Sequence, residues 1–334
     1  MKRISGVLAL VAVLLTIFGC SKKGAAKGED DYVFKIGLPL SGLCDAPERI
    51  ALEEGYYEQE GLKYEIVQVG DGEAMNLLTN GSVDGLATLM ISLIQPLANG
   101  LPVQIPLAVH TGCIKTLVPG DSPIKTAADL KGKTIGGASP AATTVLFAKR
   151  YLAGIGFKVD GENADVDFIY QSAAELPLLL ERGAVDAIGL TDPAAQIAQD
   201  ERGFRAIIDN GSSEGYKDEF CCVVTVRTDT VQNHPEATAK FLRAVQQGAK
   251  FVHENPDETA QILFETKRAA GDPLVNARLL RSFNYRASVS QALPALEHNA
   301  RDMQAIGILR ADVDVDKLVR DVYVVVPGVP DSLF

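Results

Sequence analysis

The sequence contains no tryptophan, and aromatic residues make up only 6% of its 334 residues. A surface that stacks aromatic rings on the bases of a single-stranded nucleic acid is therefore not expected. Cations are also scarce, because 32 lysines and arginines stand against 43 aspartates and glutamates, which gives a net charge of −11. Binding to a phosphate backbone requires clustered positive charge, so we expect no nucleic-acid partner.

Long apolar stretches are missing as well, except near the N-terminus. There, Lys2 and Arg3 precede an apolar run over residues 7–18, which is shorter than the ~20 residues that span a bilayer. This charge and length are typical of a signal peptide. The run ends in Ile17-Phe18-Gly19-Cys20. That ending resembles the bacterial lipoprotein box, in which a small residue precedes the cysteine that becomes lipid-modified.

We therefore predict a lipoprotein signal peptide over residues 1–20, lipidation at Cys20, and a flexible tether over residues 21–31, which have no periodic apolar pattern. Several acyl chains hold a protein stably at a membrane. The rest of the chain is then expected in the cell envelope, on the periplasmic or extracellular face of the membrane. An uncleaved anchor, or a plain signal peptide with an incidental cysteine, is the alternative.

Signature motifs of several enzyme classes are also missing. The sequence has no Walker A loop, nucleophile elbow, His-Glu-x-x-His pair or Gly-x-Gly-x-x-Gly fingerprint. We expect no cofactor and no catalytic residue.

What the sequence does contain is an alternation of strand and helix patterns. Short β-rich runs at residues 33–38, 64–69 and 85–89 alternate with helical patterns at residues 48–57 and 73–79. Such alternation predicts a mostly parallel sheet flanked by helices.

The same pattern occurs a second time. The segment Leu77-Leu-Thr-Asn-Gly-Ser-Val-Asp84 corresponds to Leu179-Leu-Glu-Arg-Gly-Ala-Val-Asp186, at an offset of 102 residues. Each copy reads as a helix stopped by glycine, followed by a tight turn into a strand. Because the elements on both sides also match, we predict two similar α/β lobes.

Two single segments are expected to join these lobes. Residues 113–119 leave the first lobe, and residues 220–227 return from the second. We therefore predict a first lobe of residues 32–117 and 223–334, which includes a helical C-terminal part, and a second lobe of residues 118–222.

Ligands of open parallel sheets bind beyond the carboxyl ends of the strands, which predicts one solute site built from the loops of both lobes. These loops carry acidic side chains and almost no lysine or arginine, so a neutral or cationic polar solute is favoured. Ser139 could instead cap the following helix, and Glu73 could be a charge at a helix N-terminus. The predicted ligand-binding residues are Ser41, Gly42, Cys44, Glu73, Thr88, Leu89, Met90, His110, Ser139, Ala141, Ala142, Thr191 and Asp192.

Histidine and cysteine also occur at a spacing seen in metal sites. His110 and Cys113 are three residues apart, and Cys44 from another loop could join them. Soft nitrogen and sulfur ligands suit zinc or copper, but a closed zinc site needs four ligands. We therefore predict no metal and assign these residues to the lining of the solute site. Cys221 and Cys222 lie in an apolar run and are expected in a buried strand.

Several segments carry a resemblance to a known family. They are Gly55-Tyr-Tyr-Glu-Gln-Glu-Gly-Leu62, residues 77–84, Asp129-Leu-Lys-Gly-Lys133 before a strand, and Asn233-His-Pro-Glu236 with its helix. Over roughly residues 33–265 the chain resembles substrate-binding proteins of ABC importers. More narrowly, it resembles their nitrate/sulfonate/taurine and NMT1/THI5-like (SsuA-type) branch.

This resemblance implies a two-lobed periplasmic-binding-protein fold of type II with two crossover hinge strands, which closes on a small molecule. It also implies delivery of that solute to an ABC permease and its ATPase, with the binding protein acting as a monomer. A pyrimidine (thiamine-precursor) synthase-like enzyme on the same fold and a lipid-anchored sensory module are the alternatives. The ligand and the redox state of the cysteines stay open.

Overall fold

The computed structural model describes residues 31–39, 42–70 and 72–334. The predicted signal peptide, almost all of the tether, Cys20 and Ser41 lie outside the described residues. Within them, no helix is both long and apolar enough to cross a membrane.

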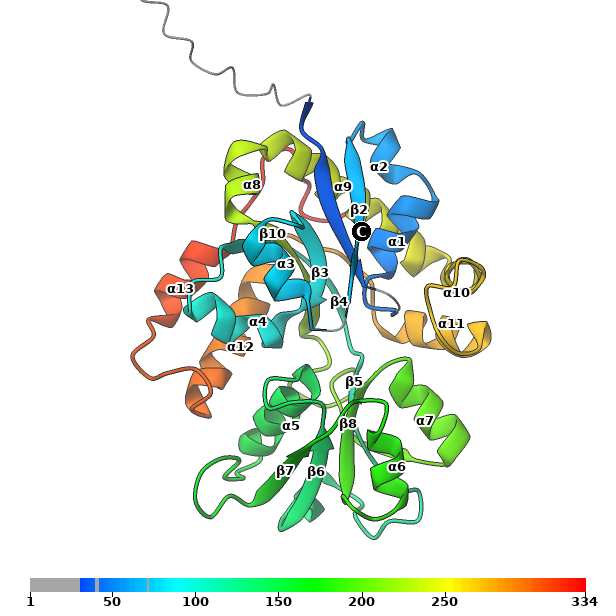
Figure 1. Ribbon diagram of the computed structural model, residues 1–334, viewed down its shortest axis with the longest axis vertical. Coiled ribbons are helices and arrows are strands. Elements are labelled where there is room, and N and C mark those ends of the chain that lie inside the picture. The colour runs from blue at the N-terminus through cyan, green and yellow to red at the C-terminus, as the bar shows by residue number, and fades with distance from the viewer. Residues whose placement is uncertain (1–30, 40–41, 71) are drawn as a thin grey trace, which may run out of the picture.

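Two five-stranded sheets form two lobes, one above the other in Figure 1. The first sheet has the order β2-β1-β3-β10-β4 and the second has the order β7-β6-β8-β5-β9. The strands of the first are β1 (Phe34–Pro39), β2 (Tyr64–Val69), β3 (Gly85–Leu89), β4 (Val103–Thr111) and β10 (Phe220–Arg227). Those of the second are β5 (Ile114–Val118), β6 (Lys133–Gly137), β7 (Val166–Tyr170), β8 (Ala187–Thr191) and β9 (Arg205–Asp209).

In each sheet one strand runs against the other four. Strand β10 is antiparallel to both β3 and β4, and β5 is antiparallel to both β8 and β9. These are the first strands that the chain forms after each passage between the sheets. The prediction of mostly parallel sheets with two crossover segments is therefore confirmed.

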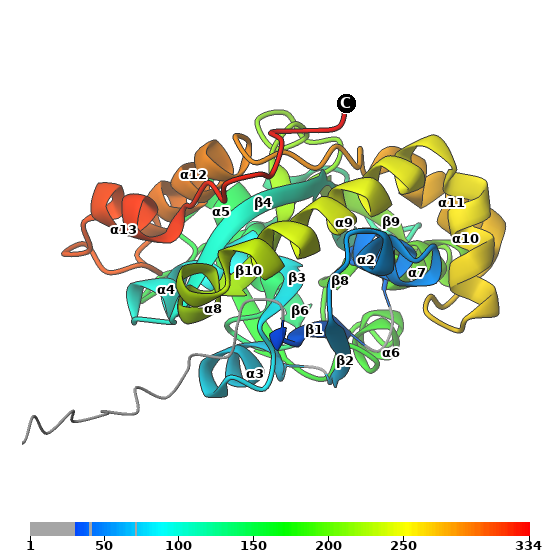
Figure 2. The same ribbon diagram turned by 90° about the horizontal axis from the view of Figure 1, so that it is seen from above.

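The helices of the first lobe pack on its sheet and on one another. Helix α9 packs against α1, and α12 packs against α4, β4 and β10. Figure 2 shows α9 lying across this lobe between α8 and α10. The first-lobe helices are α1 (Ala46–Glu53), α2 (Tyr56–Gln59), α3 (Ala74–Asn80), α4 (Met90–Ala98), α8 (Thr228–Asn233), α9 (Pro235–Glu254), α10 (Pro256–Glu265), α11 (Pro273–Ser282), α12 (Ala292–Ala305) and α13 (Val315–Val322). The second lobe has α5 (Thr143–Gly154), α6 (Leu176–Glu181) and α7 (Ala194–Arg202), with a short 3-10 helix at Ala127–Leu130.

The internal repeat is confirmed. At the offset of 102 residues, α3 falls on α6 and β3 falls on β8. In each copy an aspartate after the glycine turn accepts a hydrogen bond from a strand parallel to the one that follows it, β1 in the first lobe and β6 in the second. Lys35 N lies 2.7 Å from Asp84 Oδ2, and Thr134 N lies 2.9 Å from Asp186 Oδ2. The aspartates of the repeated motif therefore lock each turn to the neighbouring strand.

The helix predicted over residues 48–57 is wrong in its extent. Helix α1 covers Ala46–Glu53, and a separate turn, α2, follows. Gly55 causes the break because its φ of +69° lies in the left-handed region, which a continuous helix cannot accommodate.

Of the two chain segments that connect the sheets, the first is short and the second is longer. The chain leaves the first sheet at Thr111 and enters the second at Ile114, and it returns through residues 210–219. The boundaries expected at 117/118 and 222/223 both fall inside strands, β5 and β10. We propose residues 112–113 and 210–219 as the hinge segments.

Candidate functional site at the lobe crossover

The register of the strands brings the carboxyl ends of both sheets to the first crossover, Gly112-Cys113. In the first sheet, Leu89 at the end of β3 lies opposite Cys222, which in turn lies opposite His110. In the second sheet, Thr191 at the end of β8 lies opposite Ile114. Loops that follow strands of both lobes therefore flank the same short segment, where open α/β sheets bind ligands.

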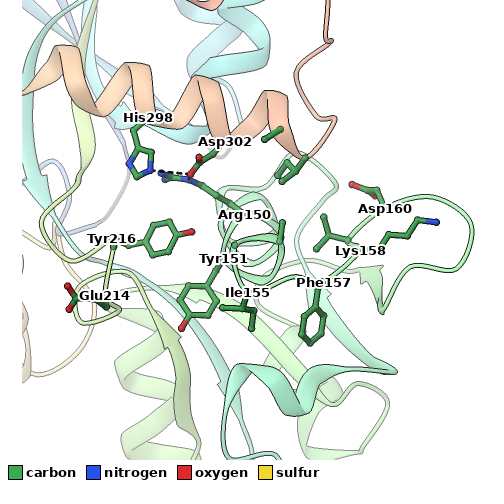
Figure 3. Close-up of a pocket in the computed structure, with 16 residues that line it drawn as sticks. Arg150, Tyr151, Ile155, Phe157, Lys158, Asp160, Glu214, Tyr216, His298 and Asp302 are labelled. Atoms are coloured by element: carbon green, nitrogen blue, oxygen red, sulfur yellow. Dashed lines mark hydrogen bonds and ion pairs between the residues drawn. The ribbon is translucent and has the colours of Figure 1, made fainter.

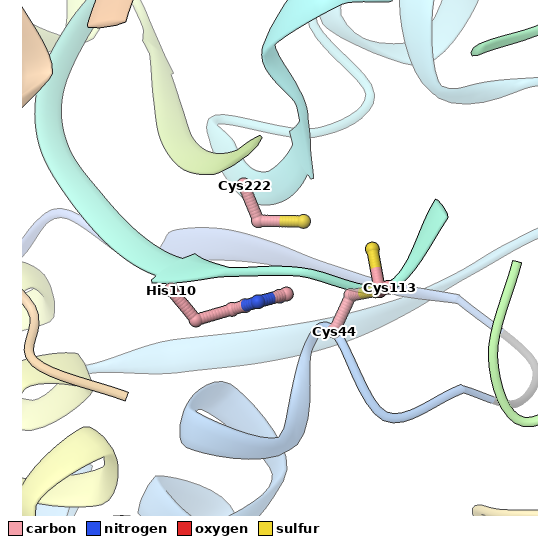
Figure 4. A group of neighbouring side chains, drawn as sticks. All are labelled: Cys44, His110, Cys113 and Cys222. Atoms are coloured by element: carbon pink, nitrogen blue, oxygen red, sulfur yellow. The ribbon is translucent and has the colours of Figure 1, made fainter. Parts of the chain in front are cut away.

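Four side chains converge at this crossover, as Figure 4 shows. Cys44 comes from the loop between β1 and α1, His110 from the end of β4, Cys113 from the crossover, and Cys222 from β10. One ligand atom from each residue lies within 4.8 Å of the other three. His110, Cys113 and Cys222 are buried, whereas Cys44 is partly exposed. We call these four residues the thiol–imidazole cluster.

His110 is held in one orientation. Its Nδ1 lies 2.9 Å from the carbonyl oxygen of Thr111, and a backbone carbonyl can only accept, so Nδ1 carries the proton. Phe283 and Tyr285 contact the ring, with centroids 5.4 and 4.7 Å away. Nε2 is buried and has no hydrogen-bond partner among the residues that the structure describes. The ring therefore keeps a free acceptor in the buried interior.

The cluster shifts the acidity of its own members. Hydrogen bonds from Cys113 and Cys222 hold the pKa of the Cys44 thiol well below its usual range, with help from His110. Burial by itself lowers the pKa of His110, but the neighbouring Cys221 and Cys44 sulfurs raise it well above its usual range. The thiols and the imidazole of the cluster therefore influence one another electrostatically.

A fourth cysteine of the described chain lies next to the cluster with its proton engaged elsewhere. Cys221 donates to the carbonyl oxygen of Gly112 at 2.6 Å, and its Sγ is 3.7 Å from that of Cys113. All four described cysteines are free thiols. Cys221 and Cys222 lie in a buried strand, as predicted, but sequence reasoning missed that they border the crossover.

A buried ion pair lies on the second-lobe side. Lys115 Nζ is 2.8 Å from Asp192 Oδ2, and the backbone N–H of Asp192 donates to the carbonyl of Cys113 at 2.9 Å. Burial raises the pKa of Asp192, against the lowering effect of Lys115. The loops were expected to hold almost no cation, and no sequence pattern indicates that Lys115, near the start of β5, reaches one of them.

The remaining predicted residues differ in how they are placed. Glu73 is exposed, and its Oε2 accepts from Gly70 N at 3.0 Å, so it orders its own loop. Met90 is fully buried at the start of α4. Thr88, Leu89 and Thr191 are partly exposed at strand ends beside the crossover.

The loop before α5 differs from expectation. The helix begins at Thr143 with Ala142 as its N-cap, so the interpretation of Ser139 as that cap is wrong. No side chain caps this helix. Ser139 and Ala142 are partly exposed and Ala141 is exposed, one strand further from the crossover than Thr191. In the first lobe, Gly42 is anchored by a hydrogen bond from its N–H to the carbonyl of Arg268.

A separate cavity of about 800 Å³ lies between α5 and α12 (Figure 3). Arg150, Tyr216, His298 and Asp302 line it, and none of the predicted ligand-binding residues does. Its charged groups already have partners, since Asp302 pairs with Arg150 at 2.6 Å, Asp160 with Lys149 at 2.7 Å and Glu214 with Lys217 at 2.8 Å. This cavity therefore offers a ligand few unpaired groups, and we take the crossover as the candidate site.

Two α/β lobes joined by two crossovers define the fold of the periplasmic binding proteins. The structure superposes on the periplasmic aliphatic sulphonate binding protein of Escherichia coli with a TM-score of 0.71, at 19% identity, over 87% of this chain and 98% of that one. The chain belongs to the NMT1/THI5-like family, whose model matches residues 46–259. The resemblance noted in the sequence is thereby confirmed.

Two relatives in sequence have names that describe different activities. The chain is 25% identical over 276 residues to a Bacillus subtilis (strain 168) protein whose name assigns it to aliphatic sulfonate binding, and the match covers 78% of each chain. It is 26% identical over 258 residues to the 4-amino-5-hydroxymethyl-2-methylpyrimidine phosphate synthase of Uromyces fabae, with 72% of each chain covered. The match to the binding protein is the longer one.

Proposed function

We propose that this protein is the extracytoplasmic solute-binding component of an ABC importer. It captures a small organic solute between its lobes and delivers it to a permease and its ATPase. The observation that carries the proposal is the meeting of strand ends from both sheets at one crossover, on a fold shared with solute-binding proteins. We propose that it acts as a monomer, held at the membrane by a lipid on Cys20, and that it is not an enzyme.

Closure in this proposal depends on differential stabilisation of two states. A solute that contacts both lobes binds the closed form more tightly and shifts the population towards it. The hinge segments, 112–113 and 210–219, absorb the rotation. Gly112 suits this role because its φ of +85° is one that glycine adopts without strain.

The solute that fits this site is polar and carries little net charge. Thr88, Ser139 and Thr191 offer hydroxyl groups, and the uncapped N-terminus of α5 offers backbone N–H groups to an electronegative atom. Lys115 does not favour an anion, because Asp192 neutralises its charge. A sulfonate would have to compete with that carboxylate, so a neutral polar solute is our first choice.

The experiment is a screen of solutes by thermal unfolding, followed by calorimetric titration of the hits. The panel contains alkanesulfonates, nitrate, taurine, pyrimidines and neutral polar metabolites. We expect one chemical class to raise Tm and to bind with a stoichiometry of one. Absence of saturable binding across the panel would overturn the proposal.

Variants then locate the binding site. Thr88→Val and Thr191→Val each remove a hydroxyl at the crossover, and we expect each to weaken binding of the identified solute about tenfold, the cost of one lost hydrogen bond. Thr79→Val is the matched control, since Thr79 lies in α3 before the opposite end of β3. Equal effects of all three variants would contradict a site at the crossover.

A further inference from the structure

We propose that Cys44, His110, Cys113 and Cys222 form a four-ligand site for a thiophilic divalent cation of the Zn²⁺ type. The first argument is spacing. Bonds of about 2.1 Å to nitrogen and 2.3 Å to sulfur place the ligand atoms of tetrahedral zinc about 3.5–3.8 Å apart. The four ligand atoms here already lie within 4.8 Å of one another. Closing the site therefore requires shifts of only about 1 Å, which side-chain rotation provides.

The second argument is the state of His110. Histidines that bind metals almost always donate their other ring N–H to a carbonyl or carboxylate, which fixes the tautomer. His110 does this through Nδ1 and Thr111, and Nε2 has no hydrogen-bond partner in the described part of the chain. An unpartnered buried nitrogen is costly, and a metal ion on Nε2 would satisfy it.

The third argument concerns Cys113. Its φ of +85° lies in the left-handed region, which residues other than glycine seldom occupy. Glycine would fit this backbone at lower cost, so the thiol is present despite the strain. A role as a metal ligand accounts for a cysteine at this position.

Cys221 lies next to the four proposed ligands but is not one of them. Its S–H donates to the carbonyl of Gly112, so it lies beside the metal ligands without joining them. Three thiolates and one imidazole give the Cys₃His set of structural zinc sites. Soft sulfur ligands select zinc over magnesium or calcium.

Binding of the ion would have a structural consequence. The four ligands come from the loop before α1, from β4, from the crossover and from β10, so one ion would fasten the crossover to the first lobe. Partly exposed Cys44 provides the route of entry. The ion would thus fix one hinge segment from the first-lobe side and form part of the floor of the proposed solute site.

The test uses the mature protein, purified under reducing conditions, treated with a chelator and titrated with Zn²⁺ or with Co²⁺ as a spectroscopic probe. We expect one equivalent to bind. Co²⁺ should show the intense visible bands of a tetrahedral site together with thiolate charge transfer, and Zn²⁺ should raise Tm. Weak binding without these bands would overturn the proposal.

Variants assign the ligands. Cys44→Ser, His110→Gln and Cys222→Ser should each weaken Zn²⁺ binding at least about 100-fold, since even partners behind the ligands contribute about 10–100-fold. Cys113→Gly is the most informative change, because it should lose the metal while relieving the backbone, so a loss of binding cannot be attributed to misfolding. Cys221→Ser and the remote His298→Gln are the controls, and both should bind one equivalent.

Two outcomes would contradict the site. One is equal Zn²⁺ affinity in the wild type and in His110→Gln. The other is a Cys113–Cys221 disulfide in protein isolated without reductant, detected by mass spectrometry after thiol alkylation, since those sulfurs are 3.7 Å apart. Neither result would touch the proposed importer function, because the titration contains no organic solute.

Discussion

The guanidinium of Arg150 donates two parallel hydrogen bonds to the carboxylate of Glu219, from Nη1 to Oε1 at 2.6 Å and from Nη2 to Oε2 at 2.7 Å. Its Nε also lies 2.6 Å from Asp302. Arg150 is on α5 of the second lobe, Asp302 is on α12 of the first, and Glu219 ends the second hinge segment. One buried arginine therefore ties both lobes and a hinge together.

Replacing this arginine should be strongly destabilising. Arg150→Met removes the bidentate partner of the largely buried Glu219, and we expect a loss of about 3–5 kcal/mol in the free energy of unfolding, measured in urea. Adding Glu219→Gln to the same chain should recover part of the loss. Arg202→Met is the control, because Arg202 pairs with Glu181 on the surface and should cost less than about 1 kcal/mol. Similar losses of unfolding free energy in the two arginine variants would contradict the inference that Arg150 links the two lobes.

The same network makes stability depend on pH. The hydrogen bond to Glu219, at 2.5 Å, raises the pKa of His298 above its usual value of 6.5. The pKa of His298 is higher in the folded state than in the unfolded state. Its contribution to the free energy of unfolding is therefore fully present below pH 6.5 and is lost as pH rises through the folded pKa. We expect the urea concentration at the midpoint of unfolding to decrease as the pH is raised from about 6 to about 8. His298→Gln should flatten this slope, and an unchanged slope would refute the assignment.

The elements of the fold could be predicted because each has a recognisable pattern in its local sequence. Period-two and helical patterns mark the strands and helices, and the motif at Leu77–Asp84 recurs at Leu179–Asp186 with its flanking elements. The loops beside the crossover could also be predicted, since strand ends are the binding edge of a parallel sheet.

The long-range contacts could not be predicted. Arg150 meets partners 69 and 152 residues away, and nothing in the local sequence pairs them. The prediction that Cys222 lies in a buried strand is correct, but a register shift in the pairing of β10 with β4 at this residue brings both Cys222 and Cys221 close to His110. That register follows from the packing of two sheets, which a single sequence does not show.

The lipid anchor makes a prediction about residues outside the described structure. Cys20→Ala should leave the protein unlabelled by radioactive fatty acid and should release it from the membrane fraction, since the acylated residue is the only attachment proposed. Cys221→Ala is the control and should keep both the label and the attachment. Label that persists without Cys20 would contradict the lipoprotein assignment.

Glu48 on α1 is fully buried, and neither carboxylate oxygen has a hydrogen-bond partner among the described residues. Burial, together with the nearby Asp45, raises its pKa well above the usual value of 4.5. The contribution of Glu48 to the free energy of unfolding is therefore fully present below pH 4.5 and is lost as pH rises through its pKa in the folded state. Glu48→Gln should stabilise the protein at pH 8 and change little at pH 4, as measured by urea unfolding. Exposed Glu53→Gln on the same helix is the control, and an equal gain there would refute the argument.

Gly248 shows how tightly α9 packs on α1. A β-carbon at this position would come within 2.0 Å of the carbonyl oxygen of Pro47, which is backbone and cannot rotate away. In an isolated helix, Gly248→Ala would gain about 1 kcal/mol from helix propensity. Here we expect the opposite sign, with a loss of about 1–3 kcal/mol as the two helices are pushed apart. Lys250→Ala on the same helix loses only surface contacts, with Glu254 and with the ring of Phe334, and should stay within about 0.5 kcal/mol. A stabilised Gly248→Ala protein would show that α1 and α9 are not packed this closely.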